Sequence, residues 1–188
     1  LPDGEIVDPF NGRADIRAGR IQTVGNPLDR FLEDGLRPVR AVRFAAQLDF
    51  TVDAGTLQAI PQSLHITKKI SIERFREEFT KMLSCQTPLT GLRLMESTGL
   101  LNLFIPELME CRGIGQGSYH HFDVLDHSFL VCNACPAGME HIHIRLAGLF
   151  HDIGKPAARK EAVDGSCTFY RHEAISEKMT RSIMRCLK

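Results

Sequence analysis

The sequence lacks several features that would assign a chain at once to a familiar class. It has no net charge, with 23 Lys and Arg against 23 Asp and Glu, which argues against a wholly basic nucleic-acid coat but allows a local basic patch. No run approaches the roughly 18 apolar residues of a membrane span, and no signal-peptide pattern is present. The chain also has no initiator methionine. We therefore expect a cytoplasmic location, no membrane partner, and a chain that is part of a longer protein.

The cysteines lack the spacing of a disulfide framework or a zinc finger. With no secretory signal, they are expected to be reduced thiols in a cytosolic protein. The one C-x-x-C pair, at 132 and 135, has no second pair at zinc-finger spacing, so a structural zinc site is not favoured there. The six scattered positions are Cys85, Cys111, Cys132, Cys135, Cys167 and Cys186.

Apolar residues recur at intervals of three and four along most of the chain, so the expected fold class is mainly α. Residues 1–25 are the exception and indicate turns and short strands. Asp8-Pro-Phe-Asn-Gly12 is turn chemistry, in which Asn-Gly indicates a hairpin, and residues 20–24 alternate as one strand. Residues 26–110 are expected to form a helical domain, and residues 111–188 a second one.

The first long helix is expected over residues 28–49, where Pro38 predicts a kink or a broken start. Residues 53–69 are polar, contain Pro61 and indicate a linker. Ser71 is expected to cap the next helix. The further helices are expected at 72–83, 88–99, 100–104, 106–108, 122–135, 140–153 and 174–187.

Residues 111–121 change character and mark the expected domain boundary. Glycines at 113, 115 and 117 alternate with other residues and indicate a mobile loop. Because no clear strand precedes them, a phosphate-binding loop is not favoured.

The polar face of the first long helix has two interpretations. Composition alone favours a solvated face with intrahelical ion pairs, such as that of Glu33 with Arg37. The alternative is functional, because an Asp and an Arg one turn apart present acceptors and donors that match the Watson–Crick edge of a nucleobase. The side chains along this face are Arg30, Asp34, Arg37, Arg40 and Arg43.

Histidines from three segments form a second candidate site. His127, the adjacent pair His151-Asp152 and His172 all lie near apolar helical faces. Histidine and aspartate resist burial unless they bind a metal or each other. Imidazole and carboxylate together suit a divalent metal that activates water for hydrolysis of a phosphate ester, and Lys155 could hold the phosphate by charge. The alternative is that these histidines merely pack.

His127, His151-Asp152 and the following Gly-Lys-Pro resemble the HD superfamily of metal-dependent phosphohydrolases. The resemblance implies an α-helical HD domain that binds Mg²⁺, Mn²⁺ or Ni²⁺ through His127, His151 and Asp152, with His172 nearby. The superfamily completes the site with a later aspartate. Asp164 is a poor candidate because it lies in a loop, so the fourth ligand is expected beyond the last residue.

Four upstream motifs resemble the bacterial class II tRNA nucleotidyltransferase and poly(A) polymerase family. The resemblance covers essentially the whole chain. It implies the end of a nucleotidyltransferase head at 1–25, a helical neck and RNA-binding domain at 26–110, and the N-terminal part of an HD domain at 111–188. The motifs are Asp8-Pro-Phe-Asn-Gly-Arg-Ala-Asp15, Arg30-Phe-Leu-Glu33-Asp34-Gly-Leu-Arg37, Arg40-Ala-Val-Arg43-Phe-Ala-Ala and Ser71-Ile-Glu-Arg74-Phe-Arg76-Glu-Glu.

This second resemblance implies addition of C, C and A, or of A alone, to the 3′ end of tRNA. Asp34 and Arg37 would pair with the base of CTP or ATP, and Glu33 would help to fix them. Arg40 and Arg43 would support the triphosphate or the RNA backbone. The expected partners are the tRNA 3′ end, CTP and ATP. No binding to DNA is expected.

The part of the family's catalytic head that carries its metal site is not represented in this sequence. In the family an Asp-x-Asp pair binds two Mg²⁺ ions for attack by the RNA 3′ hydroxyl, and no Asp-x-Asp occurs among the 188 residues. Asp8 and Asp15 do not replace it. The chain alone is therefore expected to be inactive in nucleotide transfer. The resemblance also implies that Arg74 and Arg76 order the base-recognition site from behind.

Two other functions are weighed against this one. The chain could be a stand-alone HD-type phosphohydrolase with a helical accessory domain, or a non-catalytic helical RNA-binding module. If the HD domain of the nucleotidyltransferase is itself a hydrolase, cyclic phosphates or 2′-phosphates at RNA ends are its expected substrates. The Glu33-Asp34-x-x-Arg37 motif argues against a stand-alone hydrolase, which has no use for it. The presence of a bound divalent metal in the purified protein would distinguish the hydrolase from the non-catalytic module.

Overall fold

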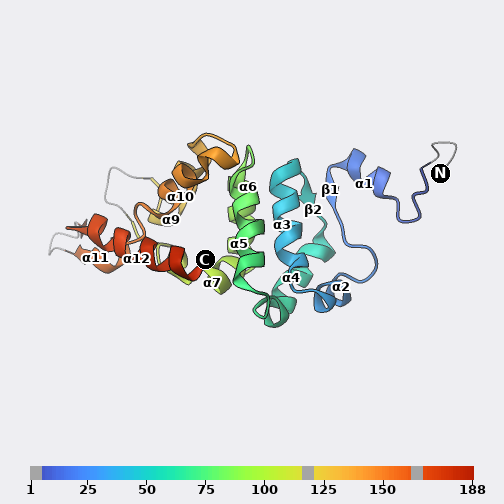
Figure 1. Ribbon diagram of the computed structural model, residues 1–188, viewed down its shortest axis with the longest axis horizontal. Coiled ribbons are helices and arrows are strands. Elements are labelled where there is room, and N and C mark those ends of the chain that lie inside the picture. The colour runs from blue at the N-terminus through green and yellow to red at the C-terminus, as the bar shows by residue number, and fades with distance from the viewer. Residues whose placement is uncertain (1–5, 116–120, 162–166) are drawn as a thin grey trace.

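Helices make up most of the regular structure in this computed structural model, which describes residues 6–115, 121–161 and 167–188. The molecule is elongated, with α1 near one end and α9–α12 at the other (Figure 1). The first elements are α1 (Gly12–Ala18), β1 (Arg20–Ile21), α2 (Pro27–Glu33), α3 (Arg37–Leu48), β2 (Thr51–Val52), α4 (Ala54–Thr67), α5 (Ile72–Leu83) and α6 (Pro88–Ser97). The others are α7 (Leu100–Phe104), α8 (Pro106–Met109), α9 (Val124–Ala134), the 3₁₀ helix η1 (Met139–His141), α10 (Ile142–Phe150), α11 (Lys155–Ala158), β3 (Lys160–Glu161), β4 (Cys167–Thr168) and α12 (His172–Cys186).

The hairpin predicted around Asn11-Gly12 is wrong, because a helix begins there. The carboxylate of Asp8 accepts the backbone N–H groups of Gly12 at 2.7 Å and Arg13 at 2.9 Å. Two of the donors that a helix leaves unpaired at its start are thereby satisfied, and α1 follows. Asn11 takes the left-handed conformation at φ 57°, which asparagine tolerates better than most residues.

The strand predicted at 20–24 is present only as the two residues of β1. It pairs in parallel with β2, in the register Arg20 to Thr51 and Ile21 to Val52. The second small sheet is antiparallel and joins β3 to β4.

The single helix predicted over residues 28–49 is two helices, α2 and α3. Asn26 caps α2 by accepting the N–H groups of Leu28 and Asp29. The helix ends at Asp34, which is extended at φ −147°, and Pro38 lies in the first turn of α3, where its missing N–H costs nothing. The broken start expected at Pro38 is confirmed.

The linker predicted over residues 53–69 is wrong, because most of it is helix α4. Asp53 caps the helix by accepting the N–H of Thr56. The buried face includes the hydroxyl residues Thr56, Ser63 and Thr67, which conceal the apolar period in the sequence. Pro61 lies inside the helix and is exposed.

The remaining helices lie close to their predicted positions. Ser71 occupies the position before α5, although its side chain makes no cap hydrogen bond with that helix. Gly148 lies where α10 crosses α9, since an added Cβ would be 3.1 Å from Val131 Cγ1 and 3.2 Å from Cys135 Sγ. This glycine therefore allows the two helices to approach closely.

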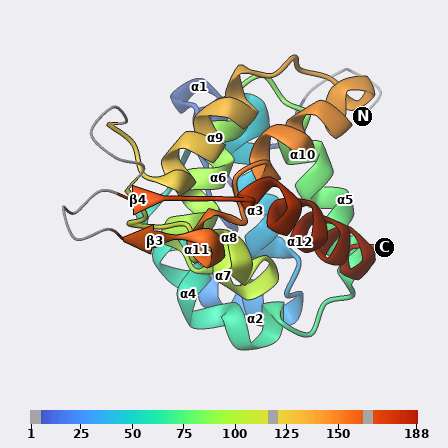
Figure 2. The ribbon, with the colours of Figure 1, turned by 90° about the vertical axis from the view of Figure 1, so that its left-hand side faces the viewer.

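One hydrophobic cluster runs through both predicted domains. Its buried members extend from Phe31 in α2 to Leu187 after α12, and α5 contributes Phe75, Phe79 and Met82. The end-on view shows α3, α5 and α6 stacked behind α9, α10 and α12 (Figure 2). The core therefore continues past the expected boundary at residues 111–121, of which 116–120 lie outside the described residues.

A buried arginine joins two helix ends inside this core. Arg145 of α10 is 1% exposed. It donates to the carbonyl oxygens of Leu83 and Cys85 at the end of α5, and to those of Cys135 at 3.0 Å and Pro136 at 2.9 Å after α9. Carbonyls at helix ends lack intrahelical partners, so one guanidinium satisfies four acceptors from both parts of the chain.

The six cysteines are free thiols, as predicted. Burial raises the pKa of the Cys111 and Cys132 thiols to about 12, so both stay protonated at neutral pH. Among the described helices, each falls short of the length and apolar character needed to cross a bilayer.

Replacing Arg145 tests its contribution to stability. Arg145→Met is expected to lower the free energy of unfolding by about 3 kcal/mol, because four buried carbonyl groups lose their donor. Denaturant unfolding followed by circular dichroism measures the change. The exposed Arg185→Met is the control and is expected to cost less than about 0.5 kcal/mol; equal losses in the two variants would contradict the role given to Arg145.

Candidate functional site

The Glu33–Arg37 motif lies at the break between α2 and α3. Arg37 Nη1 donates to Glu33 Oε2 at 2.6 Å and to the carbonyl oxygen of Arg30 at 2.7 Å. Arg30 Nη1 also pairs with Glu33 Oε2, at 2.7 Å. The predicted Glu33–Arg37 ion pair is present, but it joins the end of α2 to the start of α3 and is not intrahelical. The hydrogen bond from Arg37 lowers the pKa of the Glu33 carboxyl.

Gly35 lets this motif pack directly on α4. A Cβ at Gly35 would lie 2.8 Å from the carbonyl oxygen of Ile66 and 2.9 Å from Thr67 Cα. Both are backbone atoms, which cannot turn aside as a side chain can. No local pattern in the sequence predicts this contact, because the residues it joins are more than thirty positions apart.

Asp34 is oriented by α5. Its Oδ1 accepts the N–H of Leu36 at 3.0 Å, and Arg74 Nη2 lies 3.2 Å from its Oδ2. Burial opposes the charged form, but the hydrogen bonds from Leu36 and Arg74 outweigh it and lower the pKa of Asp34. Arg74 therefore holds this carboxylate ionised. Arg76 faces elsewhere, with Nη1 at 2.6 Å from the carbonyl oxygen of Lys188.

A cleft of about 300 Å³ lies beside the motif, between α2, α3 and the segment after β1. Arg37 and Arg40 line it together with Phe44, and Arg40 Cζ is 5.7 Å from the centre of the Phe44 ring. A flat ring beside two guanidinium groups is a suitable surface for an anionic ligand that carries an aromatic base.

Arg43 does not line this cleft. It is 8% exposed, its Nε is 2.5 Å from Glu78 Oε2, and its guanidinium lies 3.8 Å from the Phe44 ring centre. Glu78 binds Arg43, and Arg74 of the same helix binds Asp34. Arg43 therefore joins α3 to α5, whereas the sequence placed it on the solvated face.

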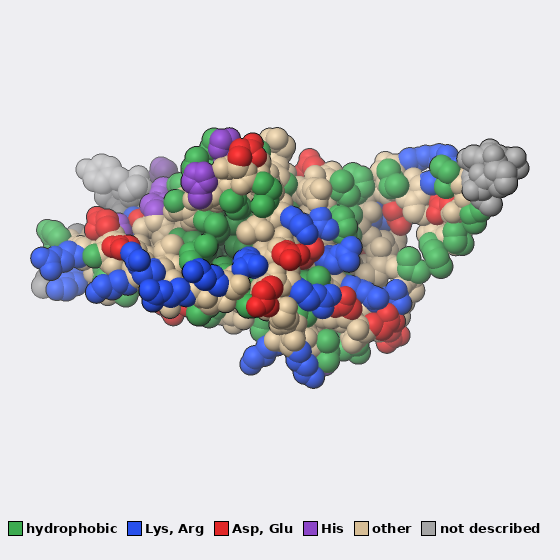
Figure 3. Space-filling model, in the orientation of Figure 1, with side chains coloured by type: hydrophobic (Ala, Val, Ile, Leu, Met, Phe, Trp, Pro, Cys, Tyr) green, Lys and Arg blue, Asp and Glu red, His purple; other side chains and the backbone are tan. Residues whose placement is uncertain are grey.

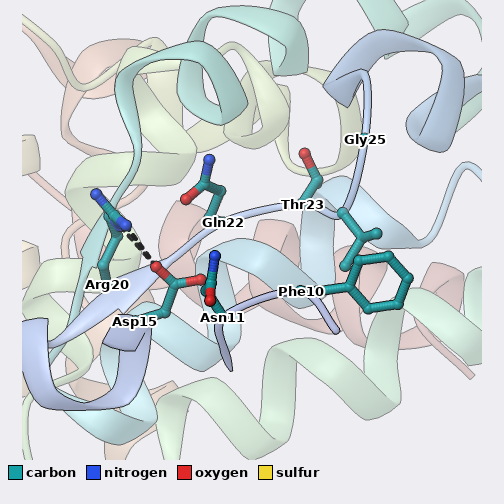
Figure 4. A pocket seen from close by; sticks show the side chains of 8 residues that line it. Phe10, Asn11, Asp15, Arg20, Gln22, Thr23 and Gly25 are labelled. Carbon is teal, nitrogen blue, oxygen red and sulfur yellow. Dashed lines mark hydrogen bonds and ion pairs between the residues drawn. The ribbon is translucent and has the colours of Figure 1, made fainter. Parts of the chain in front are cut away.

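A smaller cavity of about 270 Å³ lies at the N-terminal end of the molecule. Figure 4 shows Phe10, Asn11 and Thr23 around it, with Asp15 paired to Arg20 at 2.6 Å. The motif that contains Asp8 and Asp15 thus forms a small folded unit around α1.

The predicted metal ligands meet at the other end of the molecule. His127 from α9, His151 at the end of α10 and the following Asp152 each offer one ligand atom, and these atoms lie within 4.8 Å of one another. Asp152 Oδ2 is 3.0 Å from His151 Nε2 and 3.7 Å from His127 Nε2. His172, the first residue of α12, places its Nε2 3.3 Å from Asp152 Oδ1. Histidines gather at this end of the surface (Figure 3).

The imidazoles are held with Nε2 toward the centre of the cluster. His151 Nδ1 lies 2.8 Å from the carbonyl oxygen of Gly148, and His172 Nδ1 lies 2.8 Å from that of Phe169. A carbonyl oxygen only accepts, so each Nδ1 carries the proton and each Nε2 is the atom turned inward. Metal-binding histidines are commonly oriented in this way, and the donor set fits a divalent ion of borderline hardness.

Electrostatics keep the central carboxylate charged. Burial of Asp152 opposes ionisation, but hydrogen bonds from His151 and Lys155 hold its pKa well below the usual range. The same hydrogen bond, which His151 donates to Asp152, raises the pKa of His151. Lys155 Nζ is 2.7 Å from Asp152 Oδ2. A cavity of about 600 Å³ between α10 and α12 opens on His151, Asp152 and His172.

An ion-pair network fixes the start of α9, which carries His127. Arg112 Nη1 lies 2.9 Å from Asp123 Oδ2 and 2.7 Å from Asp126 Oδ1. Arg93 of α6 also binds Asp126, at 2.5 Å. This network could not be predicted from the sequence, because its residues come from segments without a shared motif. Asp164, weighed above as a further ligand, lies outside the described residues.

The middle of the chain matches a family model described as "Probable RNA and SrmB- binding site of polymerase A" over residues 49–111. This range runs from the end of α3 to just past α8. The fold therefore places the matched region in the helical middle of the chain, between the two candidate sites.

Relatives narrow the class to one family. The CCA-adding enzyme of Limosilactobacillus reuteri is 47% identical over 98 residues, which is 52% of this chain and 24% of that protein. The A-adding tRNA nucleotidyltransferase of Deinococcus radiodurans is 32% identical over 201 aligned residues, which is 97% of this chain and 44% of that protein. The crystal structure of the Bacillus stearothermophilus CCA-adding enzyme in complex with CTP matches 96% of this chain and 40% of that chain, with a TM-score of 0.55 and 26% identity.

The chain belongs to the class II tRNA nucleotidyltransferase family. It spans less than half the length of each of these three relatives. The mainly helical fold expected from the sequence is confirmed.

The contact at Gly35 yields a test of the motif's packing. Gly35→Ala is expected to lower the free energy of unfolding by roughly 1–3 kcal/mol, because the new methyl group meets the backbone of α4. Thermal unfolding measures this. Gly115→Ala is the matched control, since no atom of the residues that the structure describes lies within 4 Å of a Cβ built there. A Gly35→Ala variant as stable as the control would show that the turn between α2 and α3 does not pack this closely on α4.

Proposed function

We propose that the protein to which this chain belongs adds C and A, or A alone, to the 3′ end of tRNA from CTP and ATP. Family membership supports the proposal, and the observation that carries it is the Glu33-Asp34-x-x-Arg37 motif beside an arginine-lined cleft. Lys and Arg side chains also follow one face of the molecule from the α12 end to its middle (Figure 3), and such a stripe suits an RNA backbone.

The part of this reaction assigned to the chain is selection of the base. Asp34 offers acceptors and Arg37 offers donors, and both are held by partners, Arg74 and Glu33, that fix their direction. A base with the complementary edge pairs with both, whereas a base with the wrong edge leaves a buried donor or acceptor unpaired. Arg40 at the cleft is placed to contact the triphosphate. No transfer step is assigned to these residues, because the sequence contains no Asp-x-Asp.

Replacement of Asp34 tests the base-selection role. In the full-length protein, Asp34→Ala is expected to lower kcat/KM for CTP and ATP incorporation into tRNA by about tenfold or more, since the base loses a charged acceptor. Asp29→Ala, an exposed acid in the first turn of α2, is the control. Unchanged incorporation by Asp34→Ala would remove Asp34 from base selection, and extension of tRNA by the chain alone would contradict the assignment of transfer to another part.

We also propose a second activity, for which the histidine cluster is the supporting observation. His127, His151 and Asp152 would hold a divalent metal, with His172 beside them. The ion would activate water and polarise a phosphoryl oxygen, so the site would hydrolyse phosphate esters. The cavity between α10 and α12 has room for a nucleotide end, and cyclic phosphates or 2′-phosphates at RNA ends are the proposed substrates.

A measurement of metal binding distinguishes this hydrolytic activity from a structural role in which the histidines only pack. The chain is expected to bind Mn²⁺, and His151→Ala is expected to weaken binding by at least about tenfold because one of three donors is lost. Electron paramagnetic resonance of free Mn²⁺ measures the affinity. His143→Ala, an exposed histidine on α10, is the control. Equal affinities in both variants, or none in the wild type, would favour packing.

A further inference from the structure

Lys155 shares an oxygen atom with the proposed metal site. Asp152 Oδ2 is the oxygen nearer to His151 Nε2 and His127 Nε2, and Lys155 Nζ contacts that same oxygen at 2.7 Å. The other oxygen, Oδ1, faces His172. The ammonium therefore lies against the oxygen through which the carboxylate would bind an ion held by both histidines.

Local backbone geometry maintains this contact. The N–H of Lys155 donates to the carbonyl oxygen of Asp152 at 2.9 Å, so the two residues stand one turn apart with their side chains on the same side. The Lys155 side chain is 14% exposed and that of Asp152 is 5% exposed. Solvent screens such a pair poorly, and its charges act at close to full strength.

A divalent ion and the ammonium cannot both remain at Oδ2 without repulsion. An ion bound to a carboxylate lies about 2.0–2.2 Å from the oxygen, which would bring it within a few ångströms of Nζ. The ammonium has an alternative neighbour, because Nζ is 5.7 Å from the centre of the Phe169 ring. An aromatic face attracts a cation within about 6 Å, so Lys155 can withdraw toward that ring and keep a favourable contact.

We propose that Lys155 is a built-in cation that competes with the divalent metal for Asp152 Oδ2 and sets the metal affinity of the site. Without metal, it balances the buried carboxylate. When metal binds, Lys155 is released from Asp152 and becomes available to an anionic group of the substrate. This inference rests on the proposed metal centre. It adds that Lys155 controls how readily the centre binds the divalent metal.

The test measures Mn²⁺ affinity in charge-removed variants of the whole chain. Lys155→Met keeps the length of the side chain but removes its charge, and is expected to bind Mn²⁺ about tenfold more tightly than the wild type. Lys160→Met removes an exposed lysine of the same region and is expected to match the wild type. Lys155→Gln serves as a second uncharged variant if the methionine variant does not fold.

Chemical labelling of lysines in the wild type measures the same competition between Lys155 and the metal for Asp152. Acetylation of Lys155 by acetic anhydride, followed by mass spectrometry, is expected to be faster with saturating Mn²⁺ than without it, while acetylation of Lys160 stays constant. Faster labelling and tighter binding by Lys155→Met both support the inference.

The remaining outcomes separate the two proposals. Equal or weaker Mn²⁺ binding by Lys155→Met, with wild-type binding intact, overturns the competition and leaves the metal centre standing. Failure of the wild type and of both Lys155 variants to bind Mn²⁺ overturns the metal centre and the competition with it.

Discussion

The buried ion pair between Arg43 and Glu78 fixes α3 against α5, and both candidate sites depend on that registration. Removing one partner from a buried pair leaves an uncompensated charge, which typically costs about 3–5 kcal/mol. Glu78 lies on the helix that also carries Arg74 toward Asp34. The end of α5 is in turn held by Arg145 of α10, the helix that ends at His151. Helix α5 thus contacts the Glu33–Arg37 motif near its start and, through Arg145, the helix that carries His151 at its end.

Most helices could be predicted because their buried faces are built from large apolar residues. In α5, Phe75, Phe79 and Met82 recur at intervals of three and four, and the period is plain in the sequence. In α4 the buried face includes Thr56 and Ser63, whose hydroxyls hide it. Helix α1 escaped prediction for another reason: it buries no residue at all, and its start depends on a carboxylate four positions before it.

The sites were predictable where chemistry and sequence spacing coincide. Histidine next to aspartate, with a further histidine upstream, led to the cluster before any geometry was known, and the structure brings His172 to the same carboxylate. The support for these residues was not predictable. The contact of Asp34 with Arg74 spans forty positions and the network around Arg112 joins three segments. Such contacts depend on tertiary packing, which no local pattern encodes.

The uninterrupted core has a consequence for how such a protein can evolve. Side chains on both sides of the 111–121 segment, such as Leu108 and Phe129, belong to the same buried cluster. Parts that share a core cannot be exchanged or cut apart without exposing apolar surface to water on each piece. The parts of the chain before and after this segment are therefore expected to be inherited together, and a substitution that loosens one part is expected to reduce the stability of the other.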